Sequence, residues 1–169
     1  MRQMTEAGQD SRLGIRAADM AEMALLLQWR MEVLHQVFAG ASAAPWDALR
    51  AANERYYQEQ LAAGTHIACF AEREGTILGC GGVCFQQEMP SPDNPSGQCA
   101  YLMNIYVRAS YRGNGTGREI VAWLIRRAKE RGITKIYLET TAAGRRLYQG
   151  LGFADMADYM ILKGGKPDA

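Results

Sequence analysis

The chain has 169 residues, 48% of them hydrophobic, which suits one compact domain with a full core. Its net charge of +1 gives no basic footprint for nucleic acid or an anionic membrane, and no apolar run approaches the roughly 20 residues that span a bilayer. We therefore expect no nucleic-acid partner and no membrane partner. The four cysteines lie in apolar segments without a Cys-x-x-Cys pair, which favours buried free thiols over a metal site.

The two ends of the chain differ from its middle. Residues 1–12 are polar and lack the apolar core of a signal peptide, so we expect a disordered leader and a cytoplasmic location. Residues 164–169 are predicted to be a frayed tail. Residues 13–163 contain no linker and no internal repeat, and they are expected to form a single domain.

The first half of the domain predicts one strand and two helices. Gly14–Ala17 is a short strand candidate. From Met20 to about Phe38, apolar residues recur every three or four positions, which is helical spacing. Pro45 can start a second helix, Trp46–Ala63, which Gly64 ends.

The hydrophobic period then changes to that of strands. His66–Glu72 and Ile77–Glu88 flank a short turn and are predicted to form a hairpin. Glycines inside the second strand indicate a bulge, or a close approach by a backbone or a ligand. These glycines are Gly79, Gly81 and Gly82.

The second half alternates strands and helices. Gln98–Val107 is apolar on both faces, as a central strand is, and an amphipathic helix runs from Gly115 or Thr116 to Arg131. A strand, Thr134–Thr140, a short helix, Gly144–Leu151, and a last strand, Asp158–Lys163, complete the pattern. The fold class is therefore α/β with a mixed sheet, parallel where two strands flank the long helix.

A glycine-rich turn separates the central strand from the long helix. It is no P-loop, because Gly117 is followed by Arg118 and not by Lys-Ser or Lys-Thr. It is no dinucleotide fingerprint, because neither Gly113 nor Gly115 starts a Gly-x-Gly-x-x-Gly run. Its spacing is Arg112-x-x-Gly115-x-Gly117.

That spacing resembles the acyl-CoA signature of the GNAT superfamily of N-acyltransferases, Gln/Arg-x-x-Gly-x-Gly/Ala. The stretch Leu147-Tyr148-Gln149-Gly150-Leu151-Gly152-Phe153 resembles the second landmark of that superfamily. The resemblance covers roughly Leu13 to Lys163. It implies a GNAT-like fold, a central mixed sheet of about six to seven strands flanked by about four helices.

The resemblance implies acetyl-CoA as the cosubstrate. Glycines carry no Cβ, so phosphate oxygens can approach the backbone amides of the turn, and an arginine can add charge. By resemblance, the backbone of Ile105 to Val107 pairs with the pantetheine arm. The expected acetyl-CoA-binding residues are Ile105, Tyr106, Val107, Arg112, Gly113, Asn114, Gly115, Thr116, Gly117 and Arg118.

Two residues are expected to be catalytic. By resemblance, Tyr148 points at the CoA sulfur and is the acid, whereas the alternative is a tyrosine that only packs in the core. Glu139 is the first candidate for the base, because a carboxylate buried in an apolar strand can have a raised pKa. The alternatives are a hydrogen-bonded or solvated Glu139, other carboxylates (Glu32 and Glu88), and a water relay. Thr141 stands where many superfamily members carry Asn, so the substrate geometry of those relatives does not transfer directly.

The expected function is transfer of an acetyl group from acetyl-CoA to a primary amine of a small molecule, by direct attack through a tetrahedral intermediate. The alternatives are acetylation of a protein N-terminus or lysine, and a non-catalytic acyl-CoA sensor. By resemblance, the acceptor lies near the first two helices and the loop Pro90–Pro95, where carboxylates and aromatic rings can hold a cation. The side chains offered there are Arg30, Glu32, Trp46, Glu54, Tyr56 and Tyr57. A homodimer is possible, since the apolar stretch Tyr159–Leu162 could serve as an interface or simply finish the sheet.

Overall fold

The computed structural model describes residues 12–41 and 43–161. Most of the predicted leader, the whole predicted tail and the end of the predicted last strand therefore lie outside the described residues. No helix in the described part is both long and apolar enough to cross a bilayer.

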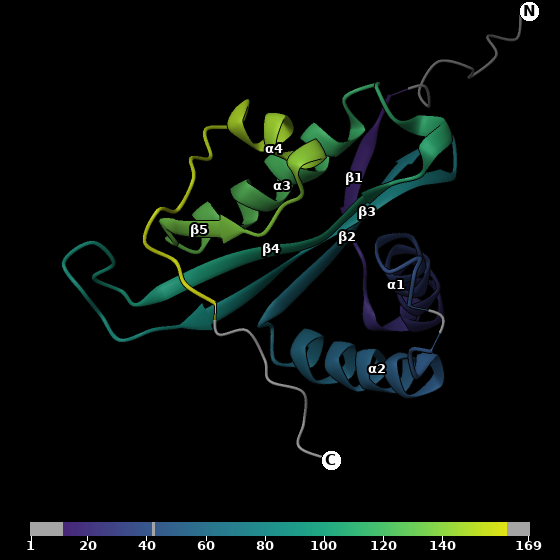
Figure 1. The fold of residues 1–169 in the computed structure, drawn as a ribbon, viewed down its shortest axis with the longest axis horizontal. Helices are drawn as coiled ribbons and strands as arrows, with labels where there is room; N and C mark the ends of the chain where they lie inside the picture. The colour runs from purple at the N-terminus through teal and green to yellow at the C-terminus, as the bar shows by residue number, and fades with distance from the viewer. Residues whose placement is uncertain (1–11, 42, 162–169) are drawn as a thin grey trace, which may run out of the picture.

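The described residues form one sheet with its strands in sequence order, β1-β2-β3-β4-β5 (Figure 1). Neighbouring strands are antiparallel, except for β4 and β5, which are parallel. The strands are β1 Gly14–Ala17, β2 His66–Arg73, β3 Thr76–Gln87, β4 Gln98–Val107 and β5 Lys135–Leu138. The predicted hairpin and the predicted parallel pair around the long helix are both confirmed.

Four α-helices cover the two faces of the sheet. Figure 1 shows α3 and α4 on one face and α1 and α2 on the other. The helices are α1 Met23–Val37, α2 Trp46–Ala62, α3 Thr116–Glu130 and α4 Ala142–Gln149. Each face has its own buried cluster, one around Ile120 and Leu124 of α3 and one around Trp29 of α1 and Phe70 of β2.

A capping box sets the start of the first helical segment. The Asp19 side chain accepts a hydrogen bond from Ala21 N at 2.8 Å, and Asp19 N donates to the Glu22 side chain at 3.2 Å. These bonds tighten Met20–Glu22 into a 3₁₀ turn, so α1 begins at Met23 and not at Met20.

The glycines of β3 allow a close approach, as their pattern predicted. A Cβ on Gly81 would lie 2.5 Å from Ile120 Cγ2, and a Cβ on Gly79 would lie 2.5 Å from Tyr106 O. Helix α3 therefore packs directly on the backbone of β3, at a depth that no side chain would permit.

A β-bulge interrupts β4. Gly82 pairs with Met103 and Cys80 pairs with Tyr106, so two residues of β4 oppose the single residue between them on β3. Asn104, the first of the two, has φ 57°, in the left-handed region that side chains other than Gly, Asn and Asp rarely adopt.

The predicted last strand is wrong for the residues described. Residues 158–161 are irregular, and Tyr159, Met160 and Ile161 are exposed. Strand β5 is only four residues long, and these three side chains belong to neither buried cluster. Among the described residues the sheet has five strands instead of six to seven. All four cysteines are buried and free, as predicted.

Candidate active site

The sheet opens between β4 and β5. The two strands pair only as far as Leu102 and Leu138, because β5 then ends and the bulge at Asn104 redirects β4. Within the described residues, no strand pairs with Ile105–Val107 on the side where β5 had been. Apart from Val107 O, which accepts a hydrogen bond from Arg112 Nε, backbone N–H and C=O groups on that side are therefore available to an extended ligand.

The glycine-rich turn lies at the end of this opening, after the short 3₁₀ helix Ala109–Tyr111. Gly113 (φ 83°) and Gly115 (φ 80°) have left-handed backbones, and a Cβ added to either would meet nothing within 4 Å. The exposed Asn114 lies between them. Gly115 is the N-cap of α3, so the unpaired N–H groups and the positive dipole end of this helix lie at the turn. Such a turn suits a phosphate group.

Two arginines of the turn are held by backbone carbonyls. Arg112 Nε donates to Val107 O at 2.8 Å, and Arg118 Nη1 donates to Gly150 O at 2.9 Å. Thr116 is buried, and its Oγ1 has no hydrogen-bond partner among the described residues. The turn thus joins the end of β4 to the end of α4 and keeps positive charge beside the open space.

Helix α4 packs against the start of α3 because Gly117 has no side chain. A Cβ there would lie 3.2 Å from Leu147 Cδ1. The next residue, Tyr148, is half-buried, and its ring meets that of Phe153 edge-on at 5.9 Å. Burial raises the pKa of Tyr148, which keeps the phenol neutral at pH 7. Its hydroxyl makes no hydrogen bond within the described part of the chain, so it is free to donate to a ligand.

Thr141 has a structural task. Its side chain accepts a hydrogen bond from Gly144 N at 3.4 Å and caps α4. A threonine at the position where many GNAT members carry Asn therefore sets the start of the helix that carries Tyr148.

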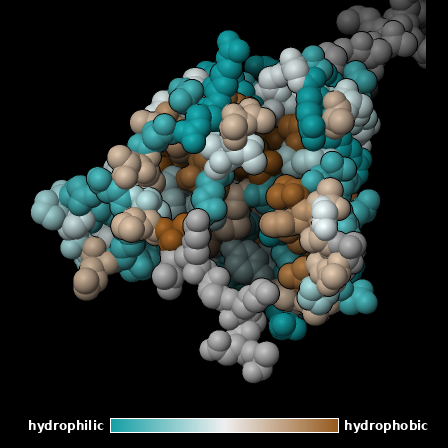
Figure 2. All heavy atoms as spheres, viewed as in Figure 1, coloured by the Kyte–Doolittle hydropathy of each residue, from teal (hydrophilic) through white to brown (hydrophobic). Residues whose placement is uncertain are grey.

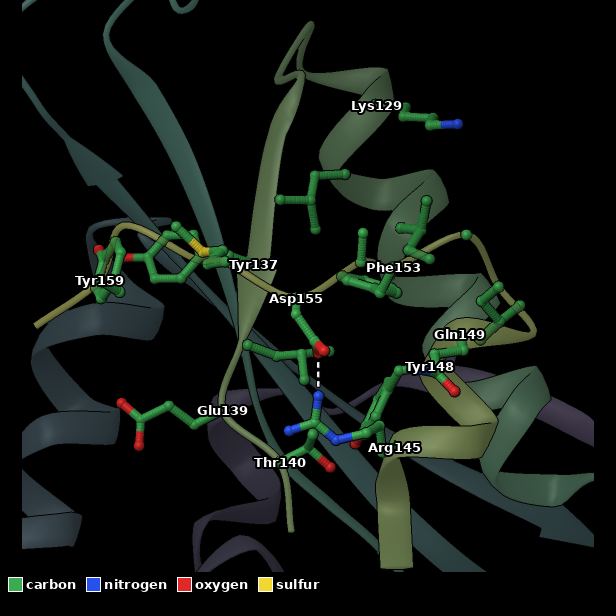
Figure 3. Close-up of a pocket in the computed structure, with 17 residues that line it drawn as sticks. Lys129, Tyr137, Glu139, Thr140, Arg145, Tyr148, Gln149, Phe153, Asp155 and Tyr159 are labelled. Carbon is green, nitrogen blue, oxygen red and sulfur yellow. Dashed lines mark hydrogen bonds and ion pairs between the residues drawn. The ribbon is translucent and has the colours of Figure 1, made fainter. Parts of the chain in front are cut away.

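Glu139 is not the buried carboxylate that its apolar strand predicted. Strand β5 ends at Leu138, and Glu139 is exposed just beyond it. Figure 3 shows its carboxylate pointing away from Tyr148 and from the Arg145–Asp155 ion pair. Its role as a base stays a prediction.

The two other candidate carboxylates are engaged in ion pairs. Arg108 contacts Glu32 with Nε at 2.9 Å and Nη2 at 2.8 Å, and this pairing lowers the pKa of Glu32. Lys135 lies 2.7 Å from Glu88 and lowers its pKa. A carboxylate with a lowered pKa is a poor base at neutral pH, so neither suits proton abstraction.

Two cavities flank the sheet. The larger, about 490 Å³, lies between α3, β5, α4 and the segment after α4, and Tyr148 is part of its lining (Figure 3). Arg145 and Asp155, which no sequence signal had marked, also line it. Figure 2 shows that the molecule is hollowed near the middle of this view, with hydrophobic residues around the hollow.

The smaller cavity, about 140 Å³, lies between α1, α2 and the sheet. Of the predicted substrate-side residues it contains only Arg30, Tyr56 and Tyr57. Trp46 instead packs against His35 in a tilted arrangement, with ring centroids 4.0 Å apart. The complete lining is Arg30, Asn53, Tyr56, Tyr57, His66, Met103 and Asn104. It has no carboxylate, so this cavity does not by itself combine the carboxylates and aromatic rings expected on the substrate side.

No group of three or more potential metal ligands occurs among the described residues. The opening, the turn and Tyr148 lie on adjoining elements, which Leu147 and Arg118 tie together. Ile105–Val107 and the turn are therefore brought together as predicted. Glu139 lines the same cavity as Tyr148, but its carboxylate points away from Tyr148 (Figure 3).

Comparison with known proteins identifies this arrangement. The sequence pattern of the acetyltransferase (GNAT) family matches residues 30–153, which is most of the chain. The chain belongs to the GNAT family of acetyltransferases. It is therefore an acyltransferase.

Individual relatives agree. "Uncharacterized N-acetyltransferase YjgM" of Escherichia coli K12 is 31% identical over 99 residues, which are 57% of this chain and 55% of that protein. The matched stretch thus spans about half the length of this relative. The crystal structure of a predicted acetyltransferase with acetyl-CoA from Clostridium acetobutylicum superposes with a TM-score of 0.80 at 28% identity, over 90% of this chain and 96% of that one. A GCN5-related N-acetyltransferase from Ralstonia eutropha, 23% identical, has the same fold, with a TM-score of 0.78 over 91% of this chain and 100% of its own.

Proposed function

We propose that the protein transfers the acetyl group of acetyl-CoA to a primary amine of a small molecule. The observation that carries this proposal is the opening between β4 and β5, which leads to the glycine-rich turn at one end and adjoins the helix of Tyr148. The Clostridium relative with acetyl-CoA supports the choice of donor.

Each part of the opening has a distinct task in donor binding. The N–H groups of Gly113 to Gly117 and the dipole of α3 receive the pyrophosphate, and the open space at Gly113 and Gly115 leaves room for its oxygens. The unpaired edge of Ile105–Val107 receives the pantetheine arm as a strand would. An N–H group on that edge also stabilises negative charge on the thioester oxygen.

The transfer conserves atoms and charge. The neutral amine nitrogen attacks the thioester carbonyl carbon, a C–N bond forms, and the C–S bond breaks. The nitrogen loses one proton to a base or water. Tyr148 gives its phenolic proton to the departing thiolate and regains one from solvent. Its half-buried, neutral hydroxyl with no partner among the described residues suits that task.

For the base we propose Glu139, acting through water. The three candidate carboxylates differ in their partners, since Glu32 and Glu88 are held in ion pairs. Glu139 is exposed at the end of β5, where solvent reaches it. A water relay then carries the proton from the amine to this carboxylate.

A small acceptor is favoured over a protein acceptor. The cavity on the α1–α2 side measures about 140 Å³, which suits a few heavy atoms more than a peptide segment. The buried free thiols suit a reducing compartment, so we place the reaction in the cytoplasm.

The test is release of CoA from acetyl-CoA with a panel of amines, amino acids, aminoglycosides and peptides. Turnover with one class of small amine is the expected result. Turnover with peptides alone would overturn the small-molecule acceptor. Binding of acetyl-CoA without release for any acceptor would favour the non-catalytic sensor.

A further inference from the structure

The side chain of Arg30 carries a positive charge that no carboxylate neutralises among the described residues. It extends from α1 into the cavity of about 140 Å³ and is partly buried. Its Nε donates to Asn53 Oδ1 at 2.9 Å, and its Nη1 donates to Asn104 Oδ1 at 3.0 Å. Both partners are neutral amides, and Nη2 has no partner within the described ranges.

Two other arginines on the α1–α2 side of the sheet are neutralised by carboxylates. Arg108 forms a two-point ion pair with Glu32, and Arg16 pairs with Glu22 at 2.7 Å and with Glu72 at 3.0 Å. A guanidinium removed from water without a counter-charge is costly, and its remaining N–H groups match the oxygens of an anion. Arg30 thus stands out as a cation prepared for an external partner.

The rest of the cavity adds no second charge. Burial, with a contribution from the charge of Arg30, lowers the pKa of His66 to about 4, so this imidazole is neutral at pH 7. Its Nδ1 is hydrogen-bonded to the Tyr56 hydroxyl at 3.1 Å. Tyr57 and Met103 supply apolar walls. A single cation with neutral surroundings matches a monoanion better than a dianion.

The cavity also has a fixed relation to the donor site. Asn104, which accepts from Arg30, is the bulge residue at which β4 separates from β5. An anion on Arg30 is therefore held beside the opening proposed for the pantetheine arm. A water molecule takes about 30 Å³ of liquid, so about 140 Å³ accommodates a carboxylate with the adjoining carbon and nitrogen.

We propose that Arg30 binds the carboxylate of the acceptor, and that the acceptor is an α-amino acid whose amine is thereby directed at the thioester. This inference rests on the proposed function and names the substrate class of the same site. It assigns Arg30 as a specificity-determining residue, with Asn53 and Asn104 as the residues that position its guanidinium.

The first experiment uses the wild-type protein and matched acceptors. CoA release is measured for L-amino acids, for their carboxamides and for the corresponding decarboxylated amines. The carboxylates should have kcat/KM values about tenfold to a hundredfold higher, because a site built for a charged group rejects the analogue that lacks it. Equal or higher values for the carboxamides or amines would overturn the proposal.

The second experiment separates Arg30 from the fold. R30Q should raise KM for the carboxylate acceptors about tenfold to a hundredfold, remove the preference over carboxamides, and leave KM for acetyl-CoA unchanged. R30K, which keeps the charge, should retain part of the preference. R55Q, on the exposed surface of α2, is the matched control and should behave as wild type. An equal loss for carboxylates and carboxamides in R30Q, or a raised KM for acetyl-CoA, would assign Arg30 a structural role instead.

A binding measurement distinguishes failure of this inference from failure of the proposed function. Calorimetric titration of the CoA-loaded protein with the amino acid and with its carboxamide requires no turnover. Selective binding of the amino acid without CoA release would retain the carboxylate site and refute the catalytic function. CoA release without any preference for carboxylates would do the reverse.

Discussion

The hydroxyl of Tyr148 has no hydrogen-bond partner among the described residues, whereas Tyr106 donates to Glu32 and Tyr137 donates to Gln86. A free phenol on α4, the helix that packs against the start of α3, suits proton donation to a thiolate. We expect Tyr148→Phe to lower kcat about a hundredfold, the lower range for general acid catalysis, with the Kd for acetyl-CoA unchanged. Stopped assays of CoA release and calorimetry measure the two quantities.

The matched control is Tyr137→Phe, which removes a hydroxyl at the sheet edge and should leave kcat unchanged. An undiminished kcat in Tyr148→Phe would exclude Tyr148 as the acid. A large rise in the Kd for acetyl-CoA would make it a binding residue.

The ion pair of Glu32 and Arg108 makes stability depend on pH. The guanidinium holds the pKa of Glu32 below its usual value of 4.5, so the pair stabilises the fold above that value and is lost as the pH falls through the folded pKa. Glu32→Gln should lower the free energy of unfolding by about 1 kcal/mol at pH 7, allowing for solvent screening, and by about nothing near pH 2. Urea unfolding at both pH values measures this.

Glu130→Gln is the control for that change, because Glu130 pairs with Arg127 on the exposed surface of α3 and should contribute little at either pH. A Glu32→Gln effect that is the same at low and neutral pH would show that packing, not charge, is lost.

At the level of elements, α3 has a left-handed glycine at each end. Gly115 (φ 80°) and Gly132 (φ 74°) both have open space where a Cβ would lie. Gly115→Val and Gly132→Val should therefore each destabilise the fold by about 1–3 kcal/mol from backbone strain. Only Gly115→Val should weaken acetyl-CoA binding, by about tenfold or more, because its side chain occupies the phosphate space. Calorimetry measures the Kd of both variants for acetyl-CoA. Equal Kd values would show that the turn is not part of the acetyl-CoA site.

The contact between α3 and β3 is tight enough to be tested by overpacking. Gly81→Ala places a methyl group 2.5 Å from Ile120 Cγ2 and should cost about 1–3 kcal/mol of unfolding free energy. Combining it with Ile120→Ala, which removes Cγ2, should cost less than the sum of the two single changes, as a double-mutant cycle shows. Gly40→Ala, which meets nothing within 4 Å, should be nearly neutral. Additive effects in the cycle would contradict the contact.

For the whole molecule, binding of acetyl-CoA should protect the α3–α4 layer from hydrogen exchange more than the α1–α2 layer. Acetyl-CoA at about a hundred times its Kd should raise the free energy of unfolding by about 2.7 kcal/mol. Hydrogen exchange should slow most at Ile105–Val107 and at the start of α3, and little in α2. Protection centred on α2 would place the donor on the wrong face of the sheet.

The sequence predicted the elements well where a single pattern dominated. The 3.6-residue period marked α3, and the spacing from Arg112 to Gly117 marked the turn. The sequence-based prediction failed where contacts between distant parts of the chain decide whether a segment joins the sheet. Tyr159 to Ile161 has strand-like composition but stays exposed, and Glu139 follows an apolar run but lies outside the strand. The sequence offered Arg30 among the substrate-side residues, but its hydrogen bonds to neutral amides emerge only in three dimensions, because Asn53 and Asn104 are distant in sequence.

The bulge at Asn104 was equally invisible, since β4 is apolar on both faces and its alternation shows no break. Yet the bulge changes which residues face which layer: Ala100 and Leu102 pack in the α3 cluster before it, and Ile105 and Val107 do so after it. The strand therefore changes from even to odd positions at this one residue. Deleting Asn104 would remove the extra residue and leave the faces as they are, because regular alternation from Leu102 then keeps Ile105 toward α3 and Tyr106 toward the Trp29 cluster. The residue therefore matters for the path of β4 where it separates from β5, and its loss would alter the opening more than the packing of the two faces.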